Sequence, residues 1–389
     1  MNVVYELFQG TYVYTAVLLV VALGGLLSEK SGVTNIALEG IMIMGAFLGI
    51  WSIKGLQTYP YSLMTMFIIV LAALSLVLLL GALVYFLLIY FEVKTPDEIK
   101  GYLQTKNGKI ISIVVIVLLT VLISYLSMRT RVQPQFTLIY GIIIGGLVGG
   151  LYAMIHAYAA VYLNANQIIS ATALNLFAPA FAIFTARLIQ GGQQVIFNSQ
   201  FMIREIPLLS SIPVIGDLFF KRTYLSFYIA IGLLLIILVI MRKTKFGLRL
   251  KACGENPQAA DSLGIDIYKV RFTAVVLSGV FAGMGGVIFV ATTSAEFSAT
   301  VDGFGFLAIA VLIFGNWKPT RILLAALFFG FMRTLAAKYS IVPILKDHGD
   351  LVQFYNMIPY VTTIVILAFF SKNSKAPKAL GEIYDKGKR

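Results

Sequence analysis

Long apolar segments alternate with short polar connections along the whole chain. Apolar runs of about 17 to 30 residues are long enough to cross the roughly 30 Å hydrocarbon core of a bilayer. The pattern predicts an all-α polytopic membrane protein with about eleven transmembrane segments. They are expected at residues 11–27, 36–55, 62–91, 110–128, 137–162, 167–190, 224–241, 271–292, 303–316, 320–337 and 357–371. The 303–316 run is short, so we expect a half-helix or a re-entrant element there.

Composition supports a membrane protein. Hydrophobic residues make up 59% of the 389-residue chain, charged residues make up 12%, and the mean hydropathy is +0.90. Soluble domains carry about 25% charged residues. The net charge of +13 does not indicate nucleic-acid binding, because the lysines and arginines lie between the predicted spans and after the last one.

These basic residues predict the orientation of the chain. Seven fall between Arg242 and Arg271 and six follow Phe370, with four predicted spans between the two groups. Both groups therefore lie on one side, which the positive-inside rule makes cytoplasmic. Residues 92–109 then also lie inside, whereas the N-terminus and the 191–223 loop lie outside. We expect one transmembrane domain over residues 1–371 and a basic cytoplasmic tail over 372–389.

Glycine spacing predicts how two spans pack. Gly141, Gly145 and Gly149 lie one helical turn apart, and Gly279 and Gly283 repeat the spacing. Small residues four apart let helices approach closely in lipid.

A polar stretch, GLRLKACGENPQAADSLGID (247–266), separates two apolar spans. Asn256 is a good N-cap, Pro257 suits the first helical turn, and Gly264 suits the residue after the C-cap. We expect two short helices around a tight GEN corner. Ala259, Ala260 and Leu263 would form an apolar surface for a soluble partner; a connector that only carries positive charge remains an equal alternative.

Motifs for catalysis are absent from the sequence. There is no G-x-x-x-x-G-K-[ST] motif, so ATP hydrolysis would require another chain. No spacing of His, Cys or acidic residues indicates a metal, and His156 is expected to be a hydrogen-bonded structural residue. We expect neither an enzyme nor a cofactor in this chain.

Polar residues at membrane depth are the candidate substrate contacts, because they are costly there. Asn35 and Glu39 are four residues apart, which predicts one helical face. Alternatively, Glu39 lies near the cytoplasmic end of the span, where it is exposed to water or pairs with Lys30. A second group comprises Asn166, Gln167, Thr172 and Asn175. Its members either line the pathway or form bonds between helices.

The segment FGLRLKACGENPQAADSLGIDIYKVRFTAVVLSGVFAGMGG closely resembles the coupling loop and following span of ABC-transporter permeases. That branch imports branched-chain amino acids, ribose-type sugars and nucleosides. NANQIISATALNLFAPA, IPVIGDLFF and GFLAIAVLIFGNWKPTRILLAALFFG are similar to the nucleoside-uptake permease subunits that pair with a second, different permease chain. The resemblance covers residues 11–55 and 137–371. Residues 62–131 have no recognised counterpart and are expected to be a peripheral helical hairpin.

The resemblance implies a type II ABC-importer-like fold in a bacterial cytoplasmic membrane. Expected partners are a homologous permease chain, ABC ATPase subunits that bind ATP-Mg, an extracytoplasmic substrate-binding lipoprotein, and the bilayer, but no nucleic acid. Amide side chains would match a nucleoside's hydroxyls and base, with Phe177 or Phe181 stacking on the base. The implied ATPase-coupling residues are Gly254, Glu255, Asn256, Pro257, Ala259, Ala260, Leu263 and Gly264.

Two alternatives remain at this stage. The chain is an ABC permease for ribose-type sugars or branched-chain amino acids, or it is a secondary transporter coupled to H⁺ or Na⁺. A coupling-ion site needs ionisable groups or unwound helices in the membrane, and Glu39 is the one candidate group.

Overall fold

A computed structural model describes residues 3–58, 134–207, 209–342 and 375–386, with a few positions between 354 and 364. The expected spans 62–91 and 110–128, and most of 357–371, lie outside the described residues. The long helices are α1 (Val3–Lys30), α2 (Leu38–Thr58), α6 (Pro134–Val161), α7 (Gln167–Gln190), α8 (Leu225–Lys243), α11 (Ile267–Thr293) and α13 (Pro319–Ala337).

These seven helices are long and apolar enough to cross a membrane. Each coincides with one predicted span. The eighth predicted span in the described part is α12 (Phe304–Phe314), which has 11 residues. At 1.5 Å per residue it is about 16 Å long, so it crosses only about half of the hydrocarbon core. The all-α membrane class and the short 303–316 element are therefore confirmed.

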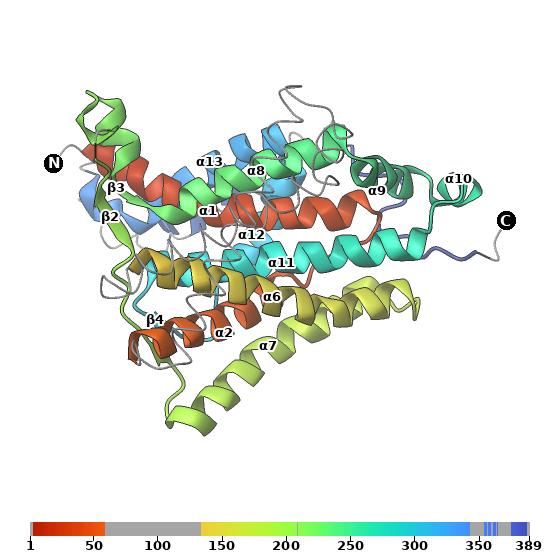
Figure 1. Cartoon of the computed structure of the whole chain (residues 1–389), viewed down its shortest axis with the longest axis horizontal. Coiled ribbons are helices and arrows are strands. Elements are labelled where there is room, and N and C mark those ends of the chain that lie inside the picture. Colours follow the sequence, from red (N-terminus) through yellow and green to blue (C-terminus); the bar gives the residue numbers. More distant parts are fainter. Residues whose placement is uncertain are drawn as a thin grey trace, which may run out of the picture.

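The helices form a bundle with two distinct ends (Figure 1). At one end lie the short helices α9 (Lys245–Glu255) and α10 (Pro257–Ser262) together with residues 375–386; we call this the α10 end. The opposite, hairpin end carries the N-terminus and strands β2 (Met202–Glu205) and β3 (Lys221–Tyr224). The 242–271 loop and the tail thus lie at the same end, as predicted. Their cytoplasmic location stays a prediction.

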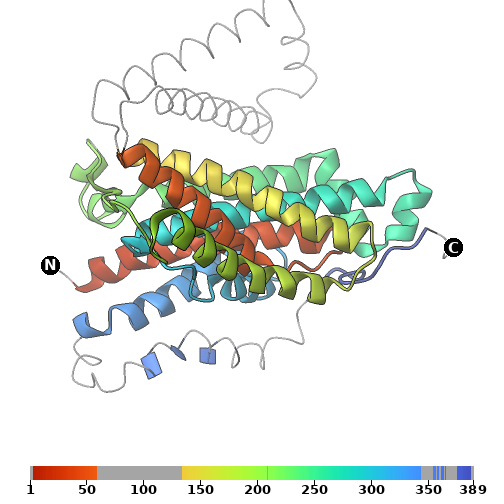
Figure 2. The ribbon, with the colours of Figure 1, turned by 90° about the horizontal axis from the view of Figure 1, so that it is seen from below.

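Helix α1 occupies the centre of the bundle. It packs against α11 and α13, and Figure 2 shows it running through the middle of the molecule. Every residue from Thr15 to Glu29 is buried. The sequence of α1 suits this buried position, because it is apolar on nearly all sides and no face needs to contact water. Helix α7, by contrast, leans away from the bundle at the hairpin end (Figure 1) and is largely exposed.

The predicted glycine contact joins α6 to α11, and α2 joins it through Gly45, which the spacing did not predict. A Cβ on Gly283 would overlap the carbonyl oxygen of Gly145, and one on Gly45 would overlap the Cα of Gly283. A Cβ on Gly149 would overlap the carbonyl oxygen of Gly279. Three backbones therefore meet where a side chain has no room, as close packing in lipid requires.

Short elements cover the hairpin end. Strands β2 and β3 pair antiparallel, with Ile203 opposite Thr223. A 3₁₀ turn (Leu209–Ser211) and a π-helical turn (Gly216–Phe220) lie between them. Strand β1 (Val195–Ile196), after α7, pairs antiparallel with β4 (Glu296–Phe297), after α11. This second pair fixes the start of the segment that leads to α12.

The three-helix glycine contact predicts a sharp difference between two substitutions. Gly283→Ala should destabilise the protein by about 1–3 kcal/mol, because the new methyl group overpacks a backbone contact. Gly232→Ala in α8 is the matched control, since nothing lies within 4 Å of its Cβ position. The midpoint of thermal unfolding in detergent should fall for Gly283→Ala only. Equal midpoints for the two variants would contradict the packing described here.

Candidate functional site

The chain is not helical between α1 and α2. Residues 31–37, which we call the broken connection, lie mostly inside the protein. The segment begins at the α10 end, where Gly32 accepts from the tail residue Gly381. Asn35 brings its later part to membrane depth, because Asn35 Nδ2 donates to Ser278 Oγ (3.0 Å) near the middle of α11. Non-helical backbone is tolerated at this depth only where the protein or a water-filled cavity satisfies its polar groups.

Helices α6 and α7 supply partners for Thr34. Its amide donates to Gln167 Oε1 (2.8 Å), and its carbonyl oxygen lies 3.2 Å from His156 Nε2. The other ring nitrogen of His156 is 3.0 Å from Ser170 Oγ. The expectation that His156 is a hydrogen-bonded structural residue is confirmed.

Asn175 joins α7 to the start of α2. Its Nδ2 donates to the carbonyl oxygen of Ile36 (3.0 Å), and its Oδ1 accepts from the amide of Gly40 (2.8 Å). Both ends of this side-chain amide are therefore used between helices. The geometry matches the interhelical alternative, and substrate contact by Asn175 stays a prediction.

Asn35 and Glu39 do not share a helical face, so that expectation is wrong. Asn35 precedes α2, which begins at Leu38. Its Oδ1 accepts from the amide of Ala37 (3.2 Å). This local bond favours a turn over a continued helix, and the helical hydrogen bonds begin with Ile41 donating to Ala37 (2.9 Å).

Glu39 lies at the start of α12. Its Oε1 accepts from the amide of Gly303 (2.9 Å) and its Oε2 from that of Gly305 (2.7 Å). The first amides of a helix lack partners within it and carry partial positive charge. The buried carboxylate of α2 therefore caps the half-helix, in place of the wet or Lys30-paired arrangement considered above.

The remaining candidates lie on the exposed side of α7. Asn166 caps the helix: its Oδ1 accepts from the amides of Ile168 (2.9 Å) and Ile169 (3.1 Å). Thr172 Oγ1 donates to the carbonyl oxygen of Ile168 (2.8 Å). The structure thus brings Asn35, Glu39, Gln167 and Asn175 together around the broken connection, and leaves Asn166 and Thr172 outside that group.

Sequence reasoning missed a second buried carboxylate. Trp317 Nε1 donates to Glu29 Oε2 (2.6 Å), which joins the end of α1 to the turn after α12. Glu29 closes a long apolar run, and a carboxylate in that place needs a buried donor. The position of Glu29 at the end of an apolar run was visible in the sequence. Its hydrogen-bond donor, Trp317, one of the two tryptophans in the chain, was not, because it lies 288 residues away.

The short helices α9 and α10 have the predicted caps. The Asn256 amide donates to the carbonyl oxygen of Ala252 (2.9 Å) at the end of α9. Asn256 Oδ1 accepts from the amide of Ala259 (3.0 Å) at the start of α10. Gly264 has a φ of +78°, which favours glycine. One residue thus ends one helix and begins the next.

The expected apolar surface of α10 is partly wrong. Five implied coupling residues are exposed: Glu255, Asn256, Ala259, Leu263 and Gly264. Leu263 has an exposed fraction of 82%. Ala260, however, packs inward with Cys253, Ile267 and Tyr384, and Gly254 and Pro257 are buried as well. A helix this short needs an inward face to be stable, and Ala260 provides it.

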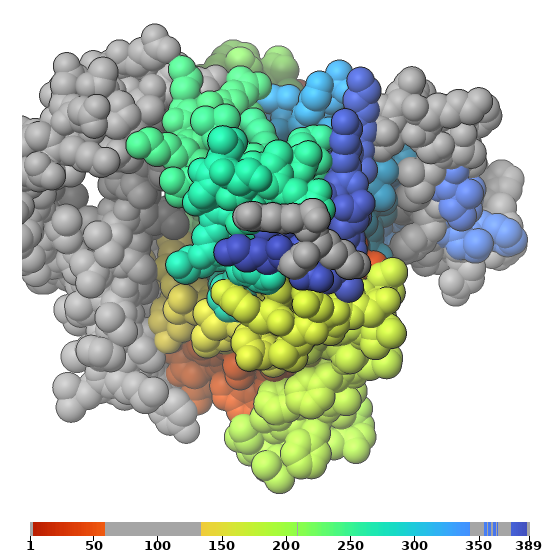
Figure 3. All heavy atoms as spheres, turned by 90° about the vertical axis from the view of Figure 1, so that its right-hand side faces the viewer, coloured from red at the N-terminus to blue at the C-terminus, as the bar shows by residue number. Residues whose placement is uncertain are grey.

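The tail holds this helix pair in place. Ala379 donates to the carbonyl oxygen of Gly254 (2.9 Å), and Gly381 donates to that of Gly32 (3.0 Å). Figure 3 shows the tail, in dark blue, lying across the α10 end. Tyr384 helps to bury Cys253, and burial raises the pKa of this thiol to about 11.

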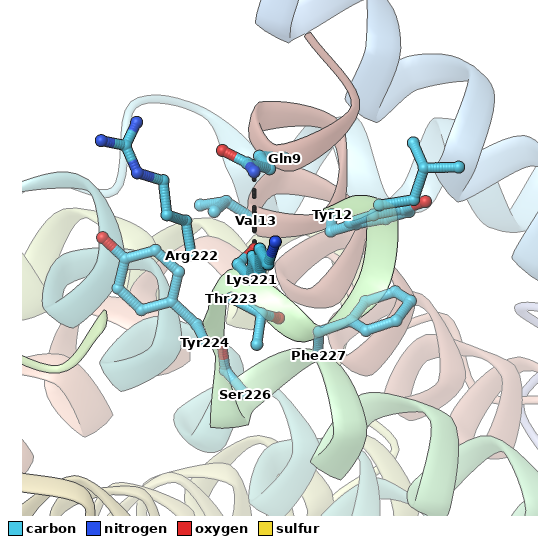
Figure 4. Close-up of a pocket in the computed structure, with 10 residues that line it drawn as sticks. Gln9, Tyr12, Val13, Lys221, Arg222, Thr223, Tyr224, Ser226 and Phe227 are labelled. Carbon is cyan, nitrogen blue, oxygen red and sulfur yellow. Dashed lines mark hydrogen bonds between the residues drawn. The ribbon is translucent and has the colours of Figure 1, made fainter. Parts of the chain in front are cut away.

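A small pocket lies at the hairpin end, between α1, β3 and the start of α8 (Figure 4). Gln9 Nε2 donates to the carbonyl oxygen of Lys221 (3.4 Å) across it. Its volume of about 10 Å³ is that of a single water. A wider groove of about 740 Å³ beside it is lined by residues of both charges, including the ion pair of Lys221 with Asp217 (2.7 Å).

The Glu39 contacts predict a selective loss of stability. Glu39→Gln should cost about 1–3 kcal/mol, because the amide presents one acceptor where two buried backbone donors converge. Thermal unfolding in detergent should show a lower midpoint. Glu205→Gln, on an exposed strand at the hairpin end, is the control and should leave the midpoint unchanged. A Glu39→Gln protein as stable as the control would mean that the cap contributes nothing.

Comparison with known proteins is consistent with this architecture. The family described as branched-chain amino acid transport system / permease component matches residues 110–367. The nucleoside ABC transporter permease protein NupC of Lactococcus lactis is 34% identical over 377 residues, covering 97% of this chain and 95% of that protein. The guanosine ABC transporter permease protein NupQ of Bacillus subtilis is 35% identical over 381 residues, covering 97% and 96%.

A third relative, the nucleoside ABC transporter permease protein NupB of Lactococcus lactis, is 33% identical over 162 residues, covering 40% of this chain and 44% of that protein. No solved structure shows significant similarity. Since NupC and NupQ each align with 97% of the chain, the expectation that residues 62–131 lack a counterpart is wrong for these relatives. The family match and the two nearly full-length relatives place this chain in the family of ABC-transporter permeases that includes the branched-chain amino acid permease components.

Proposed function

We propose that this chain is the permease subunit of an ATP-driven importer of nucleosides and forms half of a pore with a second, different permease chain. The observation that carries the proposal is the capped helix pair α9–α10. It presents an almost fully exposed Leu263 at one end of a membrane bundle. Two nearly full-length relatives named for nucleoside or guanosine transport support the substrate class.

The helix pair has a direct mechanical link to the membrane core. A Cβ on Gly254 would overlap the carbonyl oxygen of Lys30, so the end of α9 rests against the last residue of α1. The broken connection follows immediately. A push on α10 by an ATPase subunit would therefore reach the broken connection, which α6, α7 and α11 hold inside the bundle.

The proposed orientation and partners follow from this link. The α10 end faces the cytoplasm, where separate ATPase subunits bind ATP-Mg. The hairpin end faces outward and receives nucleoside from a substrate-binding lipoprotein. The membrane is the bacterial cytoplasmic membrane. Two different permease chains named for nucleoside transport in one Lactococcus strain, NupC and NupB, both resemble this chain and support a pore of two unlike halves.

The ion-coupled alternative has weaker support. The candidate group from the sequence, Glu39, accepts hydrogen bonds from two backbone amides with both of its oxygens, and the second buried carboxylate, Glu29, accepts from Trp317. An ion site at the Glu39 carboxylate would have to displace the cap of α12. Glu39 therefore serves the proposed function as a positioning residue.

Replacing Leu263 should uncouple the permease from its ATPase. Leu263→Asp should lower nucleoside-stimulated ATP hydrolysis about tenfold or more, because a charge would enter a buried contact between subunits. Ile383→Asp is the matched control, since Ile383 is also apolar and exposed at the α10 end (51%). ATP hydrolysis is measured in the complex that co-purifies with a tagged chain. Equal activity of the two variants would contradict the assignment of α10.

Energy coupling tests the function itself. In liposomes that hold the whole complex and internal ATP, labelled nucleoside should accumulate when the substrate-binding protein is added outside. An ionophore that collapses H⁺ and Na⁺ gradients should leave this accumulation unchanged. Accumulation that needs an ion gradient and continues without ATP would favour a secondary transporter instead.

A further inference from the structure

The segment between α11 and α12 returns from the hairpin end to the middle of the bundle. Helix α11 ends at Thr293, and β4 then pairs with β1 at the hairpin end. Gly303 donates to Glu39 at membrane depth. Residues 298–302 bridge the two places. Five residues extend at most about 16 Å, which is about half of the roughly 30 Å hydrocarbon core.

Side chains in this return segment alternate between buried positions, which face the interior of the chain, and exposed positions, which lie on what we call its open side. Phe297, Ala299 and Val301 have exposed fractions of 1%, 5% and 0%. Ser298, Thr300 and Asp302, between and after them, are exposed. The next exposed side chain along the sequence is Phe306 of α12, at 49%.

Lipid is an unsuitable neighbour for this open side. Non-helical backbone at membrane depth must be buried in protein or line a water-filled cavity. Hydroxyl and carboxylate side chains there face the interior of an assembly and not the acyl chains. A lipid-facing segment would show the opposite alternation, with the apolar residues outward. The polar residues of the return segment thus face water or a second chain.

Neighbouring contacts fix the end of the segment. Thr300 Oγ1 accepts from the amide of Asp302 (3.1 Å), and Glu39 binds the two amides that follow at Gly303 and Gly305. Phe304 is buried against Phe289, with ring centroids 4.6 Å apart. The backbone on either side of Asp302 is therefore held in place, which limits the ordering cost of binding a ligand there.

We propose that Ser298, Thr300, Asp302 and Phe306 line the path of the nucleoside from the hairpin end to the middle of the membrane. Hydroxyl and carboxylate oxygens suit the hydroxyl groups of a ribose, and the exposed ring of Phe306 suits the flat face of a base. The second permease chain forms the opposite wall. This inference rests on the proposed function for its ligand, and on the alternation of exposure for its location.

Cysteine accessibility tests the proposed lining of the path. Cys253 is the only cysteine, and Cys253→Ser removes it. Single substitutions Ser298→Cys, Thr300→Cys and Asp302→Cys are then compared with Ala299→Cys and Val301→Cys, the inward-facing controls on the same segment. The assembled complex in sealed liposomes is treated with a membrane-impermeant thiosulfonate, with and without saturating nucleoside.

The three outward positions should react about tenfold faster than the two inward ones, because thiolate forms in water and not in an apolar core. Nucleoside should slow their reaction several-fold. Equal rates at all five positions would overturn the inference, and so would rates unaffected by a nucleoside that the same complex transports. Nucleoside uptake by the unmodified complex is measured in parallel. Absence of that uptake would overturn the proposed function, and with it the ligand assigned here.

Thr300→Val and Thr300→Ser give an independent readout of substrate contact. Thr300→Val should raise the nucleoside concentration for half-maximal uptake several-fold. Thr300→Ser keeps the hydroxyl, so its half-maximal concentration should equal that of the unmodified chain. Equal half-maximal concentrations for both variants and the unmodified chain would overturn the contact at Thr300.

Discussion

The fold depends on satisfying the backbone of residues 31–37 inside a membrane-spanning bundle. A helix satisfies its own polar groups, whereas this segment needs side chains from elsewhere. Gln167, His156 and Asn175 provide them from α6 and α7. The same requirement appears at the start of α12, where Glu39 accepts from two amides. The break in the chain and the half-helix thus each depend on buried polar contacts made by side chains distant in sequence.

This arrangement places structure and function in one region. The buried contacts of Glu39 and Asn175 keep two discontinuous elements at membrane depth, and the return segment leading to α12 offers hydroxyl and carboxylate groups on its open side. At the α10 end, Gly254 touches Lys30, the residue before the broken connection. The proposed path of the substrate and the proposed contact for an ATPase are therefore joined through a few rigid elements. No long chain of contacts is required.

Hydropathy and local motifs predicted much of this fold. The eight spans within the described residues, the short α12, the glycine contact of α6 with α11 and the N-cap at Asn256 follow from patterns of residues near one another in sequence. The partners of Asn35, Glu39 and Asn175 did not follow, because they lie 135 or more residues away in sequence. A helical spacing of four likewise put Asn35 and Glu39 on one face, since spacing alone does not show where a helix begins. The tail's contact with α9 and α10 was also not predictable, because nothing in a basic segment indicates what it packs against.

The amount of nucleoside imported for each ATP hydrolysed tests the link between α10 and the broken connection most directly. It should be measured in the reconstituted complex for the unmodified chain and for Gly254→Ala, whose new methyl group would press on the carbonyl oxygen of Lys30. The Gly254→Ala variant should still assemble and hydrolyse ATP but import less nucleoside per ATP. An unchanged ratio would contradict the mechanical link between α9 and the end of α1.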